Sequence, residues 1–294
     1  MKMSNSIQFF DRKKDIRFAY TLIAPSLIVI FSLLGYPLVF AFLQSLQEVT
    51  ALKPQGVFIG FQNYIIVLNE PLFLTSLLRS FIFVVFSLGG SFIIGLIIAL
   101  LLNRDIFGQR IFRALVILPF IISEVSIGVI WQWLLTPQLG VINNILKQLS
   151  LSPIRWLSDP FWAMFSVITA NIWRLTPFVV LILMAGLQVI DKSYYEAAYI
   201  DGASNWQTFK HITVPMIKPM MLVSLVYLSF ASFNQFATIF SLTGGGPGNA
   251  TEVLALYMYY SAFKHFNFGY GSSIAIILFI INVILSLIYS KSLK

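Results

Sequence analysis

Six long apolar segments alternate with short polar stretches along the whole chain. A helix needs about 20 apolar residues to cross the hydrocarbon core of a bilayer. Segments near that length lie at 18–44, 77–102, 114–135, 161–185, 219–242 and 273–289. The pattern predicts an all-α, polytopic membrane protein with six transmembrane helices, in which residues 1–17 form a tail and residues 18–294 form the transmembrane domain.

The composition agrees with lipid as the natural solvent. Hydrophobic residues make up 58% of the chain and charged residues only 10%, and the mean hydropathy is +0.86. A soluble domain carries roughly 25% charged residues. The chain has no cysteine, which excludes disulfides and Cys-ligated metals. His211 and His265 fall in loops on opposite sides of the predicted bundle, so we expect no metal site.

The distribution of Lys and Arg predicts the orientation. Six spans place both termini on one side, together with the loops at 103–113 and 186–218. By our count that side carries thirteen Lys and Arg residues and the other side carries five. Because positive loops stay in the cytoplasm, we expect both termini in the cytoplasm. The net charge of +8 then reflects topology, and no nucleic-acid partner is expected.

The loop at about 186–219 is conspicuously polar for so apolar a chain. Tyr194 to Ile200 predicts a short amphipathic helix, and Gly202 breaks it. Ser204 or Asn205 can cap a second short helix, which we expect to end before Pro215. One reading of this segment is an ordinary interfacial loop held by its aromatic residues. The other is a compact knob with a function at the membrane face.

The spacing within this loop resembles the EAA loop of the permease subunits of bacterial ABC importers. That pattern is E-A-A, three residues, G, nine residues, I, one residue, L-P. This chain keeps the spacing, with Val214 at the Leu position, and has Asp191 where the family usually has Pro. The matching positions are Glu196, Ala197, Ala198, Asp201, Gly202, Ala203, Ile212 and Pro215. By resemblance, these residues dock on a cytoplasmic ATPase and transmit its closure to the spans.

Further segments resemble the carbohydrate permeases of the maltose type. They are Leu118-Pro119 followed by 130–134, then 140–143, then the L-T-G-G-G-P run at 242–247. That run is typical of the F-type half of a permease heterodimer. The resemblance implies a second, G-type permease, two ATPase subunits and an external solute-binding protein that docks near Gly244–Gly248. The chain lacks a G-x-x-x-x-G-K-[ST] motif, so no cofactor is expected on it, and ATP and Mg²⁺ belong to the partner ATPase.

Two charged residues, Glu124 and Arg174, lie inside the predicted spans. Charges in a membrane are costly and point to a function or to a named partner. Each of these residues is a candidate partner for the other. A role in contacting solute and a structural ion pair both remain open.

Polar and aromatic residues in the fourth and fifth spans form a candidate solute site. Asn171, Trp173 and Phe178 cluster in one span, and Ser232 and Gln235 lie three residues apart in the next, which places them on one helical face. A sugar needs amides, hydroxyls and a flat aromatic ring. By resemblance, Trp173, Phe178, Ser232 and Gln235 fall at sugar-lining positions, although Ser232 and Gln235 stand where the maltose-type site has Asn. Ordinary helix packing is the alternative for each.

The favoured interpretation is a non-catalytic transmembrane subunit of an ATP-driven sugar importer. A glycerol phosphate or another small solute is an alternative cargo, because a phosphate prefers a guanidinium such as that of Arg174. An ion-coupled secondary carrier would show inverted repeats and interrupted helices, and neither is evident. An intramembrane enzyme would need paired acids, a Ser–His dyad or a metal cluster, and Glu124 alone provides none of these.

Overall fold

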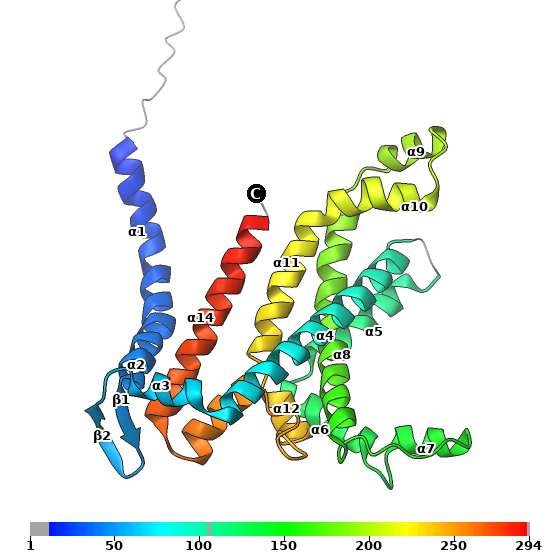
Figure 1. The fold of residues 1–294 in the computed structure, drawn as a ribbon. Coiled ribbons are helices and arrows are strands. Elements are labelled where there is room, and N and C mark those ends of the chain that lie inside the picture. The colour runs from blue at the N-terminus through cyan, green and yellow to red at the C-terminus, as the bar shows by residue number, and fades with distance from the viewer. Residues whose placement is uncertain (1–11, 105–106, 293–294) are drawn as a thin grey trace, which may run out of the picture.

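The computed structural model describes residues 12–104 and 107–292, which form long helices and one small hairpin (Figure 1). Helix α1 (Arg12–Ile30) continues through a π-helical turn (Phe31–Gly35) into α2 (Tyr36–Ser45). The predicted tail therefore becomes helical at Arg12, and its first eleven residues lie outside the described part of the chain. No side chain from Tyr20 to Gln44 is buried, as expected of a helix that faces lipid or another chain.

A two-stranded antiparallel hairpin follows the first span. Strands β1 (Gln47–Thr50) and β2 (Lys53–Phe58) pair with Gln47 opposite Phe58. Helix α3 (Gln62–Asn69) leads from the hairpin to α4 (Pro71–Leu102), the longest helix of the described residues.

The remaining helices complete the bundle. They are α5 (Gln109–Ile121), α6 (Glu124–Leu135), α7 (Val141–Gln148), α8 (Pro160–Gln188), α9 (Lys192–Ile200), α10 (Asn205–Thr208), α11 (Val214–Phe233), α12 (Ala237–Leu242), α13 (Leu254–Tyr259) and α14 (Phe268–Ser292). Among the described residues, five helices are long and apolar enough to cross a membrane, or six if the bent pair α5–α6 counts as one span. The prediction of six spans is therefore approximately confirmed.

The third span is not the straight helix that its hydropathy predicted. Helices α5 and α6 meet at an angle of 102°. Pro119 occupies the last turn of α5, where it has no N–H to donate. Ser123 then starts a new helix, because its hydroxyl accepts a hydrogen bond from the Ser126 N–H at 3.3 Å. The prediction of one continuous helix over 114–135 is wrong at this break.

The fifth span differs from its prediction at both ends. It was expected at 219–242, but α11 ends at Phe233 and the separate helix α12 covers 237–242. At the other end, α10 closes at Thr208, but the helical chain does not stop before Pro215 as was predicted. A π-helical turn (Phe209–Thr213) joins α10 to α11, with the Val214 N–H donating to the Phe209 carbonyl. This wider turn brings the chain into α11 with Pro215 in its first turn, where a missing N–H does no harm.

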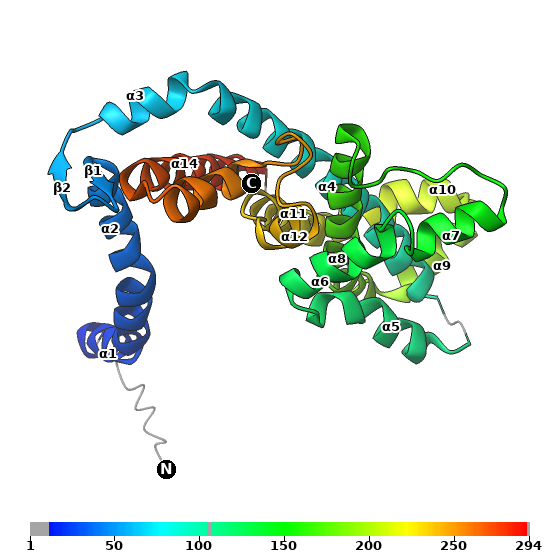
Figure 2. The same ribbon diagram turned by 90° about the horizontal axis from the view of Figure 1, so that it is seen from below.

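Helices α4, α8 and α11 form the centre of the bundle. A Cβ added to Gly95 of α4 would lie 2.6 Å from the Val179 side chain of α8, so only glycine permits this approach. Ala99, Leu183 and Ile217 are fully buried in the same cluster. Helices α1 and α2 stand apart from this centre, and α2 contacts it through α14 (Figure 2).

The elements sort to two ends of the bundle (Figure 1). The start of α1, the end of α14 and helices α9 and α10 lie at one end, which we call the loop end. The β-hairpin, α7 and α12 lie at the other, which we call the hairpin end. An even number of crossings produces this arrangement, and the placement of both termini beside the polar loop agrees with the sequence prediction. Which end faces the cytoplasm is a separate question, treated below.

Candidate functional site: an intramembrane polar network and a loop at the membrane face

The two charges in the spans form an ion pair. Nη1 of Arg174, in α8, donates to Oε1 of Glu124 at 2.7 Å. The arginine side chain is 9% exposed and the glutamate side chain 44%. Glu124 is the first residue of α6, so the break in the third span is what presents it to α8. An acid in the first turn of a helix is also stabilised by the helix dipole.

A chain of hydrogen bonds extends this ion pair to α11 and α12. Nη2 of Arg174 donates to Oδ1 of Asn171 at 3.2 Å, and Nδ2 of Asn171 donates to Oγ of Ser232 at 3.2 Å. Gln235 donates to Thr238, whose hydroxyl donates to the Glu124 carbonyl at 3.1 Å. The structure therefore brings together five candidates that the sequence had placed in three separate spans. We call Glu124, Asn171, Arg174, Ser232, Gln235 and Thr238 the polar network.

Ser232 and Gln235 do not share a helical face, contrary to the prediction. Ser232 is in the last turn of α11, whereas Gln235 follows the end of that helix and its N–H donates to the Ser232 carbonyl. Both residues are almost completely buried, as is Asn171. Most of the network is thus satisfied internally, and Glu124 is its most accessible member.

The two aromatic candidates lie in different surroundings. Phe178 is one turn beyond Arg174 on the same face of α8, and its ring stacks on Tyr227 of α11 with centroids 3.7 Å apart. Trp173 points to another side of α8, where it meets the Trp131 ring edge-on at 6.2 Å. It lines an apolar cavity of about 380 Å³ bounded by α4, α5, α6 and α8. The structure places Phe178 beside the polar network and Trp173 away from it.

The sequence analysis missed Thr238 and Tyr227. Thr238 joins Gln235 to the backbone of α6, and Tyr227 supplies the ring against Phe178. A signal for Thr238 existed, since it follows Gln235 by three residues. That spacing could not be interpreted without knowing that α11 ends at Phe233, because this break is what brings α12 back against α6.

The second candidate site is the polar loop at about 186–219, which consists of the two helices α9 and α10 joined at Gly202. Asp191 caps α9, with its side chain accepting the Ser193 N–H at 2.8 Å. Asp191, which stands where the family usually has Pro, is therefore a normal N-cap at the start of this helix. The backbone hydrogen bond from Ser193 lowers the pKa of Asp191 below its ordinary value.

Gly202 ends α9 in the left-handed conformation. Its φ is +74°, and the Ala203 N–H donates to the Ala198 carbonyl at 2.9 Å, as in a Schellman motif. A Cβ added to Gly202 would meet nothing within 4 Å. The requirement for glycine is therefore conformational rather than steric.

Ser204, and not Asn205, caps the second helix. Its hydroxyl accepts the Gln207 N–H at 3.3 Å, and the Gln207 side chain accepts the Ser204 N–H at 2.8 Å, which completes a capping box. The Tyr195 and Thr213 hydroxyls, 3.3 Å apart, tie α9 to the base of α11.

The α9–α10 loop presents a mixed surface. Glu196, Ala197, Asp201 and Pro215 are exposed, Ala203 and Ile212 are half-buried, and Ala198 is buried against the loop itself. Tyr199, Ile200 and Trp206 are 69–84% exposed. A groove of about 470 Å³ runs between the helices, with Ala197, Gly202 and Ile212 among its lining residues. Exposed apolar side chains of this size form a surface suited to contact with another protein or with the membrane interface.

The glycine-rich turn at the hairpin end is held by hydrogen bonds. The Tyr260 hydroxyl donates to the Gly244 carbonyl at 2.9 Å, and the Thr251 hydroxyl donates to the Gly246 carbonyl at 3.0 Å. Glu252, at the end of this turn, is 5% exposed. Burial raises the pKa of its carboxyl group, and the charges of Arg79 and Lys264 oppose that rise. The turn is thus better fixed than its glycine content suggested.

Within residues 12–104 and 107–292, no three His, Asp or Glu side chains converge in a way that could hold a metal ion. The chemistry available to the polar network is hydrogen bonding and charge, and the chemistry available to the α9–α10 loop is protein contact.

The described structure is a helical membrane bundle with a capped two-helix loop between its fourth and fifth spans. The chain superposes on the structure of a bacterial ABC transporter involved in the import of the acidic polysaccharide alginate, with a TM-score of 0.81 and 24% sequence identity. The superposition covers 95% of this chain and 96% of the other. This similarity establishes the fold. The chain itself belongs to the family described as binding-protein-dependent transport system inner membrane component, whose profile matches residues 91–291.

Several characterised relatives match almost end to end. The trehalose/maltose transport system permease protein MalF of Thermococcus litoralis is 35% identical, with 98% of each chain covered. The trehalose transport system permease protein SugA of Mycobacterium tuberculosis is 31% identical over 95% of this chain and 90% of its own length. The sulfoquinovosyl glycerol transport system permease protein SmoG of Agrobacterium fabrum is 31% identical over 95% of this chain and 91% of its own.

Proposed function

We propose that this chain is the transmembrane subunit of an ATP-driven carbohydrate importer and forms half of its translocation path. One observation carries the choice of cargo. Three relatives that match over at least 90% of their own length are named for the transport of trehalose, maltose and a sulfoquinovosyl glycerol, all of them sugars or glycosides. The importer is expected to contain a second, G-type permease, two ATPase subunits that bind ATP and Mg²⁺, and an external solute-binding protein.

The α9–α10 loop is the proposed contact with the ATPase, and this places the loop end in the cytoplasm. Two features support the assignment: the exposed Tyr199, Ile200 and Trp206 offer a docking surface, and α10 continues through the π-helical turn into α11. Because α11 carries Ser232 in its last turn, a displacement of the loop is transmitted along one helix to the polar network. Alternating access then follows from movement of the loop, and the chain itself breaks no bond.

The polar network is the proposed solute-contacting region, with Phe178 as the aromatic surface beside it. Glu124 is accessible in the isolated chain, whereas Asn171, Ser232 and Gln235 are buried and hydrogen-bonded. Contact between these three and a sugar therefore requires α11 or α12 to move. Trp173, which lines a separate apolar cavity, is assigned to helix packing.

The phosphate-ester cargo is less well supported than a neutral sugar. Arg174, the cation on which that alternative rests, already donates to the Glu124 carboxylate and to Asn171. A phosphate would have to displace a carboxylate from a nearly buried guanidinium. The ion pair fits the role of joining α6 to α8.

The test is the ATPase activity of the assembled complex in lipid. The full complex is reconstituted with its solute-binding protein, and ATP hydrolysis is measured with trehalose, maltose or no sugar. We expect one sugar to stimulate hydrolysis in the wild type. In Gly202→Asp the added Cβ is strained at a φ of +74°, and we expect stimulation to fall at least tenfold while the subunits remain assembled.

Gly60 supplies a matched control for this variant. Its φ is +61° and a Cβ there would also meet nothing within 4 Å, but it lies beside the β-hairpin at the opposite end. Gly60→Asp adds the same charge and a similar backbone strain, and stimulation should persist at a saturating concentration of the solute-binding protein. An equal loss of sugar-stimulated ATP hydrolysis in both variants would mean that the substitutions act by general destabilisation. A complex that recruits no ATPase would contradict the proposed function.

A further inference from the structure

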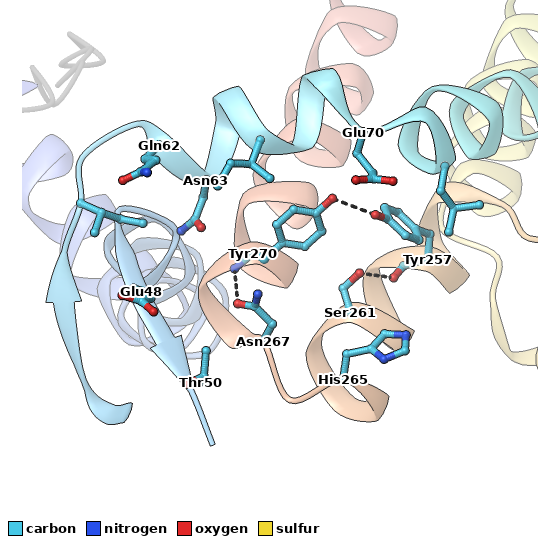
Figure 3. A pocket seen from close by; sticks show the side chains of 13 residues that line it. Glu48, Thr50, Gln62, Asn63, Glu70, Tyr257, Ser261, His265, Asn267 and Tyr270 are labelled. Atoms are coloured by element: carbon cyan, nitrogen blue, oxygen red, sulfur yellow. Dashed lines mark hydrogen bonds between the residues drawn. The ribbon is translucent and has the colours of Figure 1, made fainter. Parts of the chain in front are cut away.

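A cavity of about 620 Å³ opens at the hairpin end, separate from the polar network and from the α9–α10 loop (Figure 3). Its walls come from β1, α3, α13, the π-helical turn Tyr260–Lys264 and the start of α14. None of the residues that line it belongs to the solute site or the coupling loop assigned above. Its chemistry is therefore unexplained by transport of the sugar itself.

Hydrogen-bond acceptors in this cavity lack donors. Asn63 is 5% exposed, and its Nδ2 donates to the carbonyls of Ser45 and Gln47, each at 2.9 Å. Its Oδ1 lies on the cavity side in Figure 3 and accepts no hydrogen bond from a described residue. An amide oxygen held in place by the two hydrogen bonds of its own nitrogen is a fixed acceptor. It is available to a donor group that enters the cavity.

Glu70 adds a negative charge without a cation. Figure 3 shows its carboxylate beside the hydroxyls of Tyr257 and Tyr270, which lie 2.7 Å from each other. It accepts no hydrogen bond within the described part of the chain, and it caps α4 through its backbone only. The other carboxylate of the cavity, Glu48, is already paired with Lys53 at 2.9 Å.

The lining as a whole selects for a cation that donates hydrogen bonds. No Lys or Arg is among the described residues that line it, and His265 is the single basic group there. The Tyr257 and Tyr270 side chains supply aromatic surface, which attracts a guanidinium or ammonium group. A carboxylate, an amide oxygen and tyrosine hydroxyls provide the acceptors that such a group needs.

We propose that this cavity receives a basic side chain, Arg or Lys, that the solute-binding protein presents when it docks on the hairpin end. The inference rests on the proposed function, because it places that end outside the cell. A basic side chain complements a lining that contains the carboxylates of Glu48 and Glu70 and, among the described residues, no Lys or Arg. Complementary charges at such a contact fix the register of docking and speed association.

Occupancy of the cavity would also connect docking to the spans. The Ala51 N–H donates to the Phe266 carbonyl at 3.1 Å, and Thr50 pairs with Asn267 just before α14. A side chain bound in the cavity would lie between α3, which carries Asn63, and the start of α14, which carries Tyr270. Helix α14 in turn packs against α11, which leads to the α9–α10 loop.

The test compares two variants with the same change in charge. Glu70→Gln removes the unpaired carboxylate, while Asn69→Lys adds a charge at the neighbouring exposed residue, which does not line the cavity. The full complex is placed in nanodiscs of phosphatidylcholine and phosphatidylglycerol, which contain no primary amine. Affinity for the purified solute-binding protein is then measured by surface plasmon resonance, together with basal ATPase activity.

We expect Glu70→Gln to weaken binding roughly tenfold, the loss of one charge-assisted hydrogen bond. Asn69→Lys should change it less than twofold, and basal ATPase activity should be unchanged in both. Agmatine, a soluble guanidinium probe, should compete with the solute-binding protein on the wild type and not on Glu70→Gln. Equal affinity of wild type and Glu70→Gln would overturn the inference while leaving the proposed function intact.

Two other outcomes also decide the matter. Agmatine that binds through Glu70 without affecting the solute-binding protein would make this a site for a free organic cation and overturn the docking role. A wild-type complex that binds no solute-binding protein at all would contradict the proposed function and this inference together.

Discussion

Arg174 and Glu124 are paired, but they are not equivalent. The arginine side chain is 9% exposed and the glutamate 44%, so the arginine depends far more on its partner for compensation of charge. Removing one member of a buried pair costs mainly through the charge that is left behind. The consequence of a substitution should therefore depend on which side of the pair it removes.

Glu124→Gln should destabilise the protein more than Arg174→Met. We expect a loss of about 2–3 kcal/mol in the free energy of unfolding for Glu124→Gln, below the range for a fully buried pair because Glu124 is half-exposed. Arg174→Met leaves a carboxylate that water can reach and should cost less. Unfolding in mixed detergent micelles measures both. The double variant should recover part of the loss, and the opposite order of the single variants would contradict this account.

Asp191 gives the α9–α10 loop a dependence on pH. The hydrogen bond from Ser193 lowers the pKa of Asp191 in the folded protein, so the unfolded chain binds more protons near the ordinary value of 3.8. The cap therefore contributes stability above that pH and loses it as the pH falls through the lowered pKa.

Protection of the α9 amides against hydrogen exchange, expressed relative to intrinsic rates, should fall on acidification below about pH 4. Asp191→Asn retains a capping oxygen that does not titrate in this range, so its protection should not follow the same acid dependence. Protection in the wild type that is constant from pH 6 to pH 2.5 would show that Asp191 does not control the start of α9.

At the residue scale, the sequence predicted which charged side chains form an ion pair better than it predicted where the polar residues lie relative to the helix ends. The pairing of Glu124 with Arg174 could be anticipated because they were the only charges away from the ends of the predicted spans. The positions of Ser232 and Gln235 could not, since the helix ends between them for a tertiary reason. Gln235 bonds to Thr238, and Thr238 bonds to the backbone of α6. No local pattern contains that information.

At the scale of elements, the α9–α10 loop shows that specific local sequence signals can predict where short helices begin and end. The left-handed Gly202 and a capping serine followed three residues later by Gln207 are both readable from sequence. The sequence left Ser204 and Asn205 open as caps, and the hydrogen bonds choose Ser204.

Ser204→Ala should destabilise α10 by about 1 kcal/mol, the usual cost of a lost N-cap. Asn205→Ala is the matched control, because Asn205 occupies the first helical position and its side chain has no capping role. The readout is hydrogen exchange at the Gln207 and Thr208 amides, which should accelerate several-fold in Ser204→Ala alone. Equal acceleration in both variants would assign the cap wrongly.

Hydropathy located the spans but not their interruptions. It sums apolar character over a window, so it passes over Ser123 and Asn234, where short polar residues break a helix inside an apolar run. The π-helical turn before Pro215 was equally invisible, since it depends on how α10 enters α11. These breaks place the ends of α6 and α11 beside α8, and the polar network exists because of them.

At the scale of the whole molecule, three layers follow one another from end to end. The α9–α10 loop lies at one end and the β-hairpin at the other (Figure 1). The polar network lies within the spans, and the acidic cavity lies beside the hairpin. Helix α11 connects the loop to the polar network, and α14 packs against α11. A signal can therefore pass between the ends through two packed helices, without a domain outside the membrane.

The measurement that tests this account most directly is sugar accumulation in proteoliposomes that contain the full complex. Labelled trehalose or maltose and the solute-binding protein are supplied on one side, and MgATP on the other or nowhere. We predict accumulation against the gradient only when ATP is on the side of the α9–α10 loop, with loss in Gly202→Asp and retention in Gly60→Asp. Accumulation that persists without ATP, driven by a proton or sodium gradient, would contradict the account and identify a secondary carrier.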